Sequence, residues 1–321
     1  MLRDEVITVF GGSGFLGRHV VRALARAGYR VRVATRRPHL AQDLRVMGVV
    51  GQVQLVQSNI RVPASVDRAV EGASGVVNLV GVLAEQGRQN FSRLHAMGAA
   101  AVAEACREAG IETLIQVSAI GADAESASAY ARTKAEGEAA VLDTVPTASI
   151  LRPSIVFGPE DDFFNRFAAM SRFVPALPLI GGGQTRFQPV FAGDVASAVL
   201  AAMESGEARG ETYELGGPGI YTFKEVLEFI LKTVDRPRFL VPLPFPVSSV
   251  MAMAFELVGA LPLIPTFLTQ DQVKLLKSDN VVSDDAKTLA DLGIEGETVE
   301  AIVPSYLERY RRYGQFHETE A

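Results

Sequence analysis

Three side chains in the first half of the chain have the types and spacing needed for proton transfer. Tyr130 and Lys134 are four residues apart in a segment with helical periodicity, so both project from one helix face. A lysine ammonium beside a tyrosine lowers the pKa of the phenol, which can then donate a proton to a substrate carbonyl. Ser118 follows an apolar run and could hydrogen-bond the same carbonyl.

The N-terminal residues predict the scaffold that would position this chemistry. Val6–Phe10 is an apolar run typical of a buried strand, and Gly11–Gly17 is a glycine-rich turn. Arg18–Ala27 has apolar positions at helical spacing, and Tyr29–Thr35 reads as a second strand. This order is typical of the dinucleotide-binding half of a doubly wound sheet.

The three glycines of the turn have distinct predicted roles. Gly11 permits a tight turn, Gly14 lets the backbone approach a pyrophosphate, and Gly17 lets the helix pack close to the strand. The free N–H groups of the helix N-terminus would bind the phosphates. A plain structural turn is the alternative interpretation.

The end of the second strand indicates which dinucleotide is bound. An NAD site usually has an acidic residue there, which holds the ribose 2′-hydroxyl, but this chain has Thr35-Arg36-Arg37. A guanidinium can bind a 2′-phosphate through two charge-assisted hydrogen bonds, so NADP(H) is the predicted cofactor. A solvated arginine pair is the alternative.

Further strands and helices alternate up to residue 160. Strands are expected at 51–57, 75–81, 113–118 and 148–151, and helices at 39–47, 63–70, 90–109 and 128–142. We therefore predict an α/β fold with a doubly wound parallel sheet, whose ligand lies at the carboxyl ends of the strands. The predicted cofactor-binding residues at this edge are Gly11, Ser13, Gly14, Phe15, Leu16, Gly17, Arg36, Arg37, Asn59, Ile60, Val80, Gly81, Val82, Ser118, Tyr130, Lys134, Pro153 and Ile155.

The second half of the chain is less regular. We expect residues 1–160 to form the NADP-binding core, with 187–204 returning to it, and 161–321 to form a smaller C-terminal lobe. Asp194 is a suitable N-cap for a helix at 195–203. Residues 241–267 are strongly apolar but interrupted by prolines, and the unbroken piece is shorter than the ~20 residues needed to span a bilayer. They could pack in the core, or form an apolar face for a partner or a membrane surface.

Composition excludes several classes of protein. The chain of 321 residues is 48% hydrophobic with a net charge of −6, which argues against a general nucleic-acid binder. Its one cysteine excludes an internal disulfide, and its four histidines have no metal-ligand spacing. The first strand begins almost at the initial Met, so we expect no signal peptide and a location on the cytoplasmic side in a bacterium.

The combination of Gly11-x-x-Gly14-x-x-Gly17, Tyr130-x-x-x-Lys134 and Leu151-Arg152-Pro153 resembles the extended and atypical short-chain dehydrogenase/reductases. A closer resemblance, from about Val6 to Tyr310, is to the complex I alpha-subcomplex subunit 9 family, the NADPH-binding accessory subunits of respiratory NADH:ubiquinone oxidoreductase and their bacterial relatives. The segments that resemble it are 10–18, 44–52, 157–161, 188–190, 268–272 and 291–294.

This resemblance implies a tightly held NADPH with a structural role, on the membrane-facing flank of the peripheral arm of complex I near the quinone site. Arg36 matches the 2′-phosphate position, and Tyr130 and Lys134 match the ribose-binding pair. Active relatives usually place Asn in the long helix after the fourth strand, where this chain has His95. His95 could relay protons in its place or be an ordinary packed or surface residue.

Three functions follow as hypotheses. The chain could be a peripheral accessory subunit of complex I on the cytoplasmic side of the inner membrane, with other complex I subunits as partners, membrane contact through 241–267, and no metal or nucleic acid. It could instead be a free NADPH-dependent reductase or epimerase that uses Ser118, Tyr130 and Lys134. A helper role in quinone biosynthesis is the third possibility.

Overall fold

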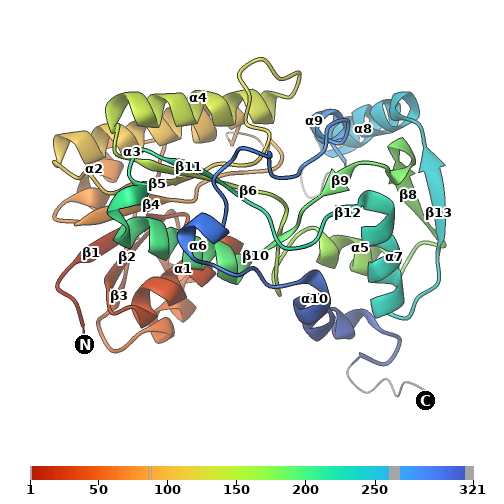
Figure 1. Ribbon diagram of the computed structural model, residues 1–321, viewed down its shortest axis with the longest axis horizontal. Helices are drawn as coiled ribbons and strands as arrows, with labels where there is room; N and C mark the ends of the chain where they lie inside the picture. The colour runs from red at the N-terminus through yellow and green to blue at the C-terminus, as the bar shows by residue number, and fades with distance from the viewer. Residues whose placement is uncertain (1, 86, 88, 260–267, 315–321) are drawn as a thin grey trace. The chain divides into compact units, whose positions relative to one another are not determined.

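A computed structural model describes residues 2–85, 87, 89–259 and 268–314 (Figure 1). The chain forms two compact units, each built from three separate segments of the sequence. The first consists of Met1–Pro153, Ala192–Leu215 and Val282–Glu295, and the second of Ser154–Phe191, Gly216–Val281 and Gly296–Ala321.

The first unit contains a seven-stranded parallel sheet with the order β11-β6-β5-β4-β1-β2-β3. The predicted doubly wound α/β fold is confirmed. The chain moves outward from β1 to β3, then returns to β4 beside β1, so the carboxyl ends of β1 and β4 form the switch point where such sheets bind ligands. The strands are β1 (Val6–Phe10), β2 (Arg30–Thr35), β3 (Val53–Gln57), β4 (Gly75–Asn78), β5 (Leu114–Val117), β6 (Ser149–Pro153) and β11 (Thr212–Leu215).

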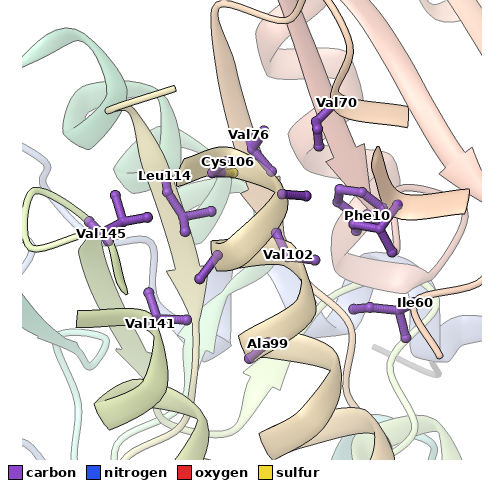
Figure 2. Close-up of a cluster of buried hydrophobic side chains, with 14 of the residues drawn as sticks. Phe10, Ile60, Val70, Val76, Ala99, Val102, Cys106, Leu114, Val141 and Val145 are labelled. Carbon is purple, nitrogen blue, oxygen red and sulfur yellow. The ribbon is translucent and has the colours of Figure 1, made fainter. Parts of the chain in front are cut away.

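Helices cover both faces of this sheet (Figure 1). One face is covered by α2 (Pro63–Val70), α3 (Met97–Glu108) and α4 (Ala129–Thr144), and the other by α1 (Phe15–Arg26) and α6 (Ala192–Glu204). Figure 2 shows the apolar cluster under the first group, where side chains from strands and helices interdigitate. Because both faces are buried, the strands are nearly continuous apolar runs in the sequence.

Three helices of the first unit differ from the predictions. The expected helix at 39–47 is two short 3₁₀ segments, η1 (Pro38–Leu40) and η2 (Gln42–Met47), and only one of their side chains, Leu44, is buried. Such a segment has no apolar stripe to dock an α-helix. The expected helix at 90–109 begins with a π-helical turn, η3 (Ser92–Ala96), before α3.

The third difference concerns Asp194, which is not an N-cap. Helix α6 begins at Ala192, directly after the strand β10 (Val190–Phe191), so Asp194 lies inside its first turn and is buried. A carboxylate in the first turn still interacts favourably with the positive end of the helix dipole.

The second unit contains three two-stranded sheets in its described part and a core rich in phenylalanine. Phe157, Phe163, Phe164, Phe187 and Phe223 pack ring against ring. The sheets pair β7 (Val156–Phe157) with β10 (Val190–Phe191), β9 (Arg186–Phe187) with β12 (Tyr221–Thr222), and β8 (Ala176–Ile180) with β13 (Phe239–Leu243). The helices are α5 (Phe164–Met170), α7 (Phe223–Thr233), α8 (Phe245–Gly259), α9 (Gln270–Leu275) and α10 (Val299–Leu307). Short 3₁₀ turns elsewhere in the chain are η4 (Gly181–Gly183), η5 (Gly206–Ala208), η6 (Ala290–Leu292) and η7 (Glu308–Tyr310).

The apolar segment 241–267 forms the end of β13 and helix α8, while 260–267 lie outside the described residues. On α8, Val247, Val250 and Met253 are exposed, whereas Ser248 and Ala252 are buried. The described part of this segment therefore presents apolar side chains to solvent as well as to the core. None of the helices in the described ranges is long and apolar enough to cross a bilayer.

Candidate nucleotide site

The glycine turn forms a close-packed cradle at the end of β1. Gly11 has a φ of +79°, and a Cβ there would lie 3.1 Å from the carbonyl carbon of Leu79, which follows β4. A Cβ on Gly17 would lie only 2.3 Å from the carbonyl oxygen of Gly11. Gly14 is the N-cap of α1 and brings no side chain to the first-turn N–H groups of Phe15 and Leu16. Only glycine fits at 11 and 17, and the helix end has the form of an anion site.

The end of β2 adds uncompensated positive charge. The hydroxyl groups of Ser13 and Thr35 lie 3.1 Å apart and join the turn to this strand. Arg36 and Arg37 follow and are exposed, and their guanidinium groups form no hydrogen bond or ion pair with any described residue. Arg18, by contrast, is paired with Asp43. Both predicted phosphate-binding arginines therefore keep their hydrogen-bond donors available.

The end of β3 is a structured turn. The Asn59 Oδ1 accepts hydrogen bonds from the backbone N–H (3.2 Å) and Nε (3.3 Å) of Arg61, and the Asn59 N–H donates to the Ser65 Oγ at 3.0 Å. Ile60 is buried within the apolar cluster of Figure 2. The side chain of Ile60 therefore contributes to the core as well as lying at the predicted site.

The loop after β4 is held from two sides. The Asn78 Oδ1 accepts from the Val80 N–H at 3.1 Å, and the His95 Nε2 accepts from the Val82 N–H at 3.1 Å. A Cβ on Gly81 would lie 3.3 Å from the Lys134 Nζ, so the loop passes directly over the lysine ammonium. These contacts bring Val80, Gly81 and Val82 close to the Tyr130–Lys134 helix.

His95 is a packed residue with both ring nitrogens occupied. Its Nδ1 lies 3.2 Å from the Thr133 Oγ1, and that hydroxyl lies 2.8 Å and 3.1 Å from two carbonyl oxygens of its own helix. Because the hydroxyl has one hydrogen, which a carbonyl accepts, its oxygen accepts the hydrogen of Nδ1. His95 is therefore the neutral Nδ1–H tautomer, with Nε2 as the acceptor from Val82.

The surroundings keep His95 neutral. Its side chain is stacked on Phe91, with ring centroids 5.3 Å apart, and the residue is 2% exposed. Burial, together with the positive charge of Lys134, lowers the pKa of His95 to about 3. A neutral imidazole with both nitrogens engaged is a clamp between Val82 and Thr133, so of the two interpretations of His95 the structure favours the packed residue.

The three predicted catalytic side chains come from the carboxyl end of β5 and the N-terminal half of α4. Ser128 caps α4, and Tyr130 and Lys134 follow on one face, with the Lys134 Nζ 5.9 Å from the centroid of the Tyr130 ring. The Nζ donates to the Val117 carbonyl at 3.3 Å. The Ser118 Oγ is buried and has no hydrogen-bond partner among the described residues. A buried hydroxyl without a partner is costly, so this atom fits the polar group of a ligand.

The titration of the tyrosine differs from the prediction. Burial raises the pKa of Tyr130 to about 12. Burial also lowers the pKa of Lys134 to about 8, while the negative charge of Glu138 opposes this shift. The predicted lowering of the phenol pKa by the ammonium is therefore wrong for this structure, because desolvation of the phenolate is the larger effect.

A chain of charges behind Lys134 was missed by sequence reasoning. The Arg152 guanidinium binds both oxygens of Glu138, at 3.0 Å and 2.6 Å, and lies 3.7 Å from Glu214. The Ser283 N–H donates to the same Glu214 carboxylate at 2.8 Å. The spacing of Lys134 and Glu138, one helical turn, was a signal for the first link. Nothing local links Arg152 to Glu214, 62 residues later on β11.

Pro153 and Ile155 complete the predicted set. Pro153 ends β6, and its carbonyl oxygen accepts from the Ile120 N–H at 3.0 Å. Ile155 is half-buried and belongs to the second unit. Within the described ranges, no three His, Cys, Asp or Glu side chains are grouped as a metal site would require.

Comparisons with known proteins agree with this geometry. Residues 7–216 match the model of the NAD dependent epimerase/dehydratase family. The chain is 37% identical over 319 residues to the mitochondrial NADH dehydrogenase (ubiquinone) 1 alpha subcomplex subunit 9 of Arabidopsis thaliana, a match that covers 96% of this chain and 79% of the relative. It is 32% identical over 243 residues to the ceramide reductase of Caulobacter vibrioides, covering 75% of this chain and 74% of that one.

The fold is also that of solved structures. The NADPH-dependent quinone oxidoreductase of Escherichia coli, solved in complex with NADPH, superposes with a TM-score of 0.74 at 19% identity, covering 94% of this chain and 99% of that one. The family model, together with the glycine cradle and the unpartnered Ser118 hydroxyl, supports a nicotinamide dinucleotide as the cofactor. The chain belongs to the NAD dependent epimerase/dehydratase family and, within it, to the family of the complex I alpha subcomplex subunit 9.

Proposed function

We propose that this chain is an NADPH-binding accessory subunit of respiratory complex I, in which the cofactor is mainly structural. The observation that carries the proposal is the state of His95. By the family resemblance, it stands at or near the position where active relatives usually have Asn. Its two nitrogens are bound to Val82 and Thr133 rather than open to a proton relay. The raised pKa of Tyr130 points the same way, because a weakly acidic phenol is a poor proton donor.

The residues present fit a tightly held dinucleotide. The Gly11–Gly17 cradle and the α1 N-terminus would hold the pyrophosphate, Arg36 the 2′-phosphate, and Tyr130 with Lys134 the ribose. The Ser118 Oγ would gain the hydrogen-bond partner that it lacks. NADPH supplies hydride transfer when it is bound to an active enzyme. Here its binding to the folded chain would stabilise the first unit.

The test of the cofactor assignment is the nucleotide content of the purified chain. We expect NADPH to be released on denaturation, and Arg36→Glu to abolish its retention by placing like charge at the 2′-phosphate. The matched control is Arg30→Glu, an exposed arginine at the opposite end of β2, which should keep the nucleotide. Unchanged NADPH content in Arg36→Glu, or NADH in the native chain, would contradict the assignment.

The place of the chain in the complex is part of the same proposal. We infer a peripheral position on the cytoplasmic side of the membrane, near the quinone-site and membrane-facing part of the peripheral arm. Subunit 9 relatives match almost the whole chain, and the exposed apolar residues of α8 provide a surface on which neighbouring subunits could pack.

Native gel electrophoresis of gently solubilised membranes tests this assembly. A tagged copy should migrate with the large band that stains for NADH dehydrogenase. Val250→Glu on α8 should shift the tag to a small species, whereas Val50→Glu on the first unit should not, although both valines are exposed. A native tag found only as a small soluble species would contradict the subunit role.

A free reductase is the second candidate. It is supported by the intact Ser118, Tyr130 and Lys134 and by the similarity to the ceramide reductase of Caulobacter vibrioides. NADPH oxidation that depends on an added carbonyl compound, and that Tyr130→Phe abolishes, would favour it.

A further inference from the structure

The second unit has a strongly basic surface in a chain whose net charge is −6. Three segments far apart in the sequence contribute to it: the residues after α5, the stretch from the end of α7 to β13, and the residues after η7. We call it the basic face, and it consists of Arg172, Lys232, Arg236, Arg238, Arg311 and Arg312.

Backbone carbonyl groups hold three of these arginines in place. The Arg236 Nε donates to the Tyr310 carbonyl at 2.7 Å, the Arg238 Nε to the Ser171 carbonyl at 2.8 Å, and the Arg311 Nε to the Thr233 carbonyl at 3.0 Å. A carbonyl fixes the orientation of a guanidinium without cancelling its charge. The central part of the basic face, formed by Arg236, Arg238 and Arg311, is therefore preorganised and still cationic.

The positive charges are close enough to affect one another. Burial lowers the pKa of Arg236, and the charges of Arg238, Arg172 and Arg312 lower it further. The carboxylates nearby do not neutralise the group: Glu228 is paired with Lys224 at 3.6 Å, and Asp235 only partly offsets the repulsion at Arg236. Mutual repulsion of this kind is relieved when an anionic surface approaches.

Each of three arginines on the basic face is followed by an exposed aromatic residue. Phe173 is 80%, Phe239 78% and Tyr313 62% exposed. The Arg172 guanidinium lies 5.5 Å from the Phe173 ring centroid, and that of Arg312 5.6 Å from the Tyr313 ring centroid. Aromatic rings beside basic groups are typical of surfaces that enter the headgroup layer of a membrane.

A hollow of about 620 Å³ opens on this face. Four basic residues line it, Lys224, Lys232, Arg236 and Arg238, together with the carboxylates Glu228 and Asp235 and the side chains of Leu231, Pro237, Phe239 and Leu240. Four cations against two carboxylates leave the lining net positive, which suits a phosphate, and its apolar side chains suit the first carbons of an acyl chain.

We propose that the basic face docks on an anionic phospholipid surface. The arginines bind headgroup phosphates, and the three aromatic side chains enter the interfacial layer. The described residues that carry this inference all belong to the second unit, whereas the glycine cradle and Arg36 belong to the first. The inference goes beyond the proposed function, because it holds whether or not the cofactor is structural.

Vesicle flotation with the purified full chain tests the proposal. We expect binding to vesicles of phosphatidylcholine mixed with phosphatidylglycerol and little binding to phosphatidylcholine alone. Each basic residue near such a surface contributes roughly fivefold to partitioning, so Arg172→Gln/Lys232→Gln/Arg312→Gln should weaken it by roughly 100-fold. The matched control, Arg22→Gln/Arg26→Gln/Arg68→Gln, removes the same charge from exposed positions of the first unit and should change it little.

Salt dependence separates the aromatic part of the contact. Added salt should release Phe173→Ser/Phe239→Ser from the mixed vesicles more readily than the native chain, because only the arginine contacts are screened. Thermal unfolding is measured to check that each variant is folded. Equal binding to both vesicle types, or equal weakening by the test and control triples, would overturn the proposal. Arg36→Glu should bind vesicles normally, so loss of NADPH and loss of lipid binding are distinguishable.

Discussion

The two ends of the predicted nucleotide site differ in how much of their bonding capacity the protein already uses. At the phosphate end, the N-terminus of α1 has no side-chain cap and Arg36 has no partner among the described residues. At the other end, His95 and Lys134 are buried and hydrogen-bonded to protein groups, and only the Ser118 Oγ among the described side chains there is left without a partner. The site is thus open where a cofactor would be held and immobilised where a proton would move.

This difference explains how a reductase-like site could serve a structural purpose. Binding a dinucleotide requires donors aimed at phosphates and a close backbone approach, and the glycine cradle retains both. Catalysis also requires groups whose pKa values lie near the working pH. The pKa of Lys134, at about 8, lies near neutrality, but that of Tyr130, at about 12, and that of His95, at about 3, lie far from it.

Among the substitutions proposed, the largest loss of stability is expected at the buried ion pair behind Lys134. Arg152→Met leaves the Glu138 carboxylate buried and unpaired, and should lower the free energy of unfolding by about 3 kcal/mol. Urea denaturation measures it. Adding Glu138→Gln should recover part of the loss, and Arg209→Met, which breaks an exposed pair with Glu112, should change little. A loss no greater than that of Arg209→Met would mean that the buried charge chain does not stiffen this end.

The next largest effect is expected at the phosphate end. Gly17→Ala places a Cβ against the Gly11 backbone, which cannot move without opening the turn, and should cost about 2 kcal/mol and most NADPH retention. The matched control is Gly206→Ala, because a Cβ there meets nothing within 4 Å. Stability and nucleotide content are read on the same preparations, and a Gly17→Ala protein that retains NADPH would refute the cradle.

The pH dependence of the free energy of unfolding tests whether His95 is held neutral in the folded protein. Its pKa is about 3 when folded against 6.5 for an ordinary histidine, so its stabilising contribution is complete above pH 6.5 and is lost as pH falls toward 3. Between pH 7 and pH 5 this amounts to about 2 kcal/mol of unfolding free energy. His95→Phe should lose that part of the pH dependence. If both proteins change equally between these pH values, His95 is not held neutral.

Much of the first unit could be predicted from sequence because its signals are local. The apolar runs at Val6–Phe10 and 113–118 became strands, and the carboxyl ends of neighbouring strands of the sheet brought Gly11, Gly81 and Ser118 to one edge. Parallel topology alone is sufficient for this, since every such strand ends at the same edge.

The features that could not be predicted depend on partners distant in the sequence, or on the balance between burial and charge, which the sequence does not reveal. Arg152 meets Glu214 only because β11 pairs with β6. The tautomer of His95 follows from a hydroxyl 38 residues away. For Tyr130, the spacing to Lys134 indicated a lowered pKa, but the depth of burial decided the direction.

The smallest effect is expected for the substitution that asks about chemistry directly. Tyr130→Phe removes one hydroxyl and keeps the ring that packs edge-on against Phe91 and His95, with centroids 5.8 Å and 5.3 Å away. If Tyr130 only helps to hold the ribose, NADPH content and migration with the complex should stay nearly unchanged. The free energy of unfolding should change by no more than about 1 kcal/mol, the worth of one hydrogen bond. If the hydroxyl instead transfers a proton, binding should persist while carbonyl-dependent NADPH oxidation falls at least 100-fold, approximately. Retained binding is common to both outcomes, so turnover is the measurement that distinguishes a structural nucleotide from a working one.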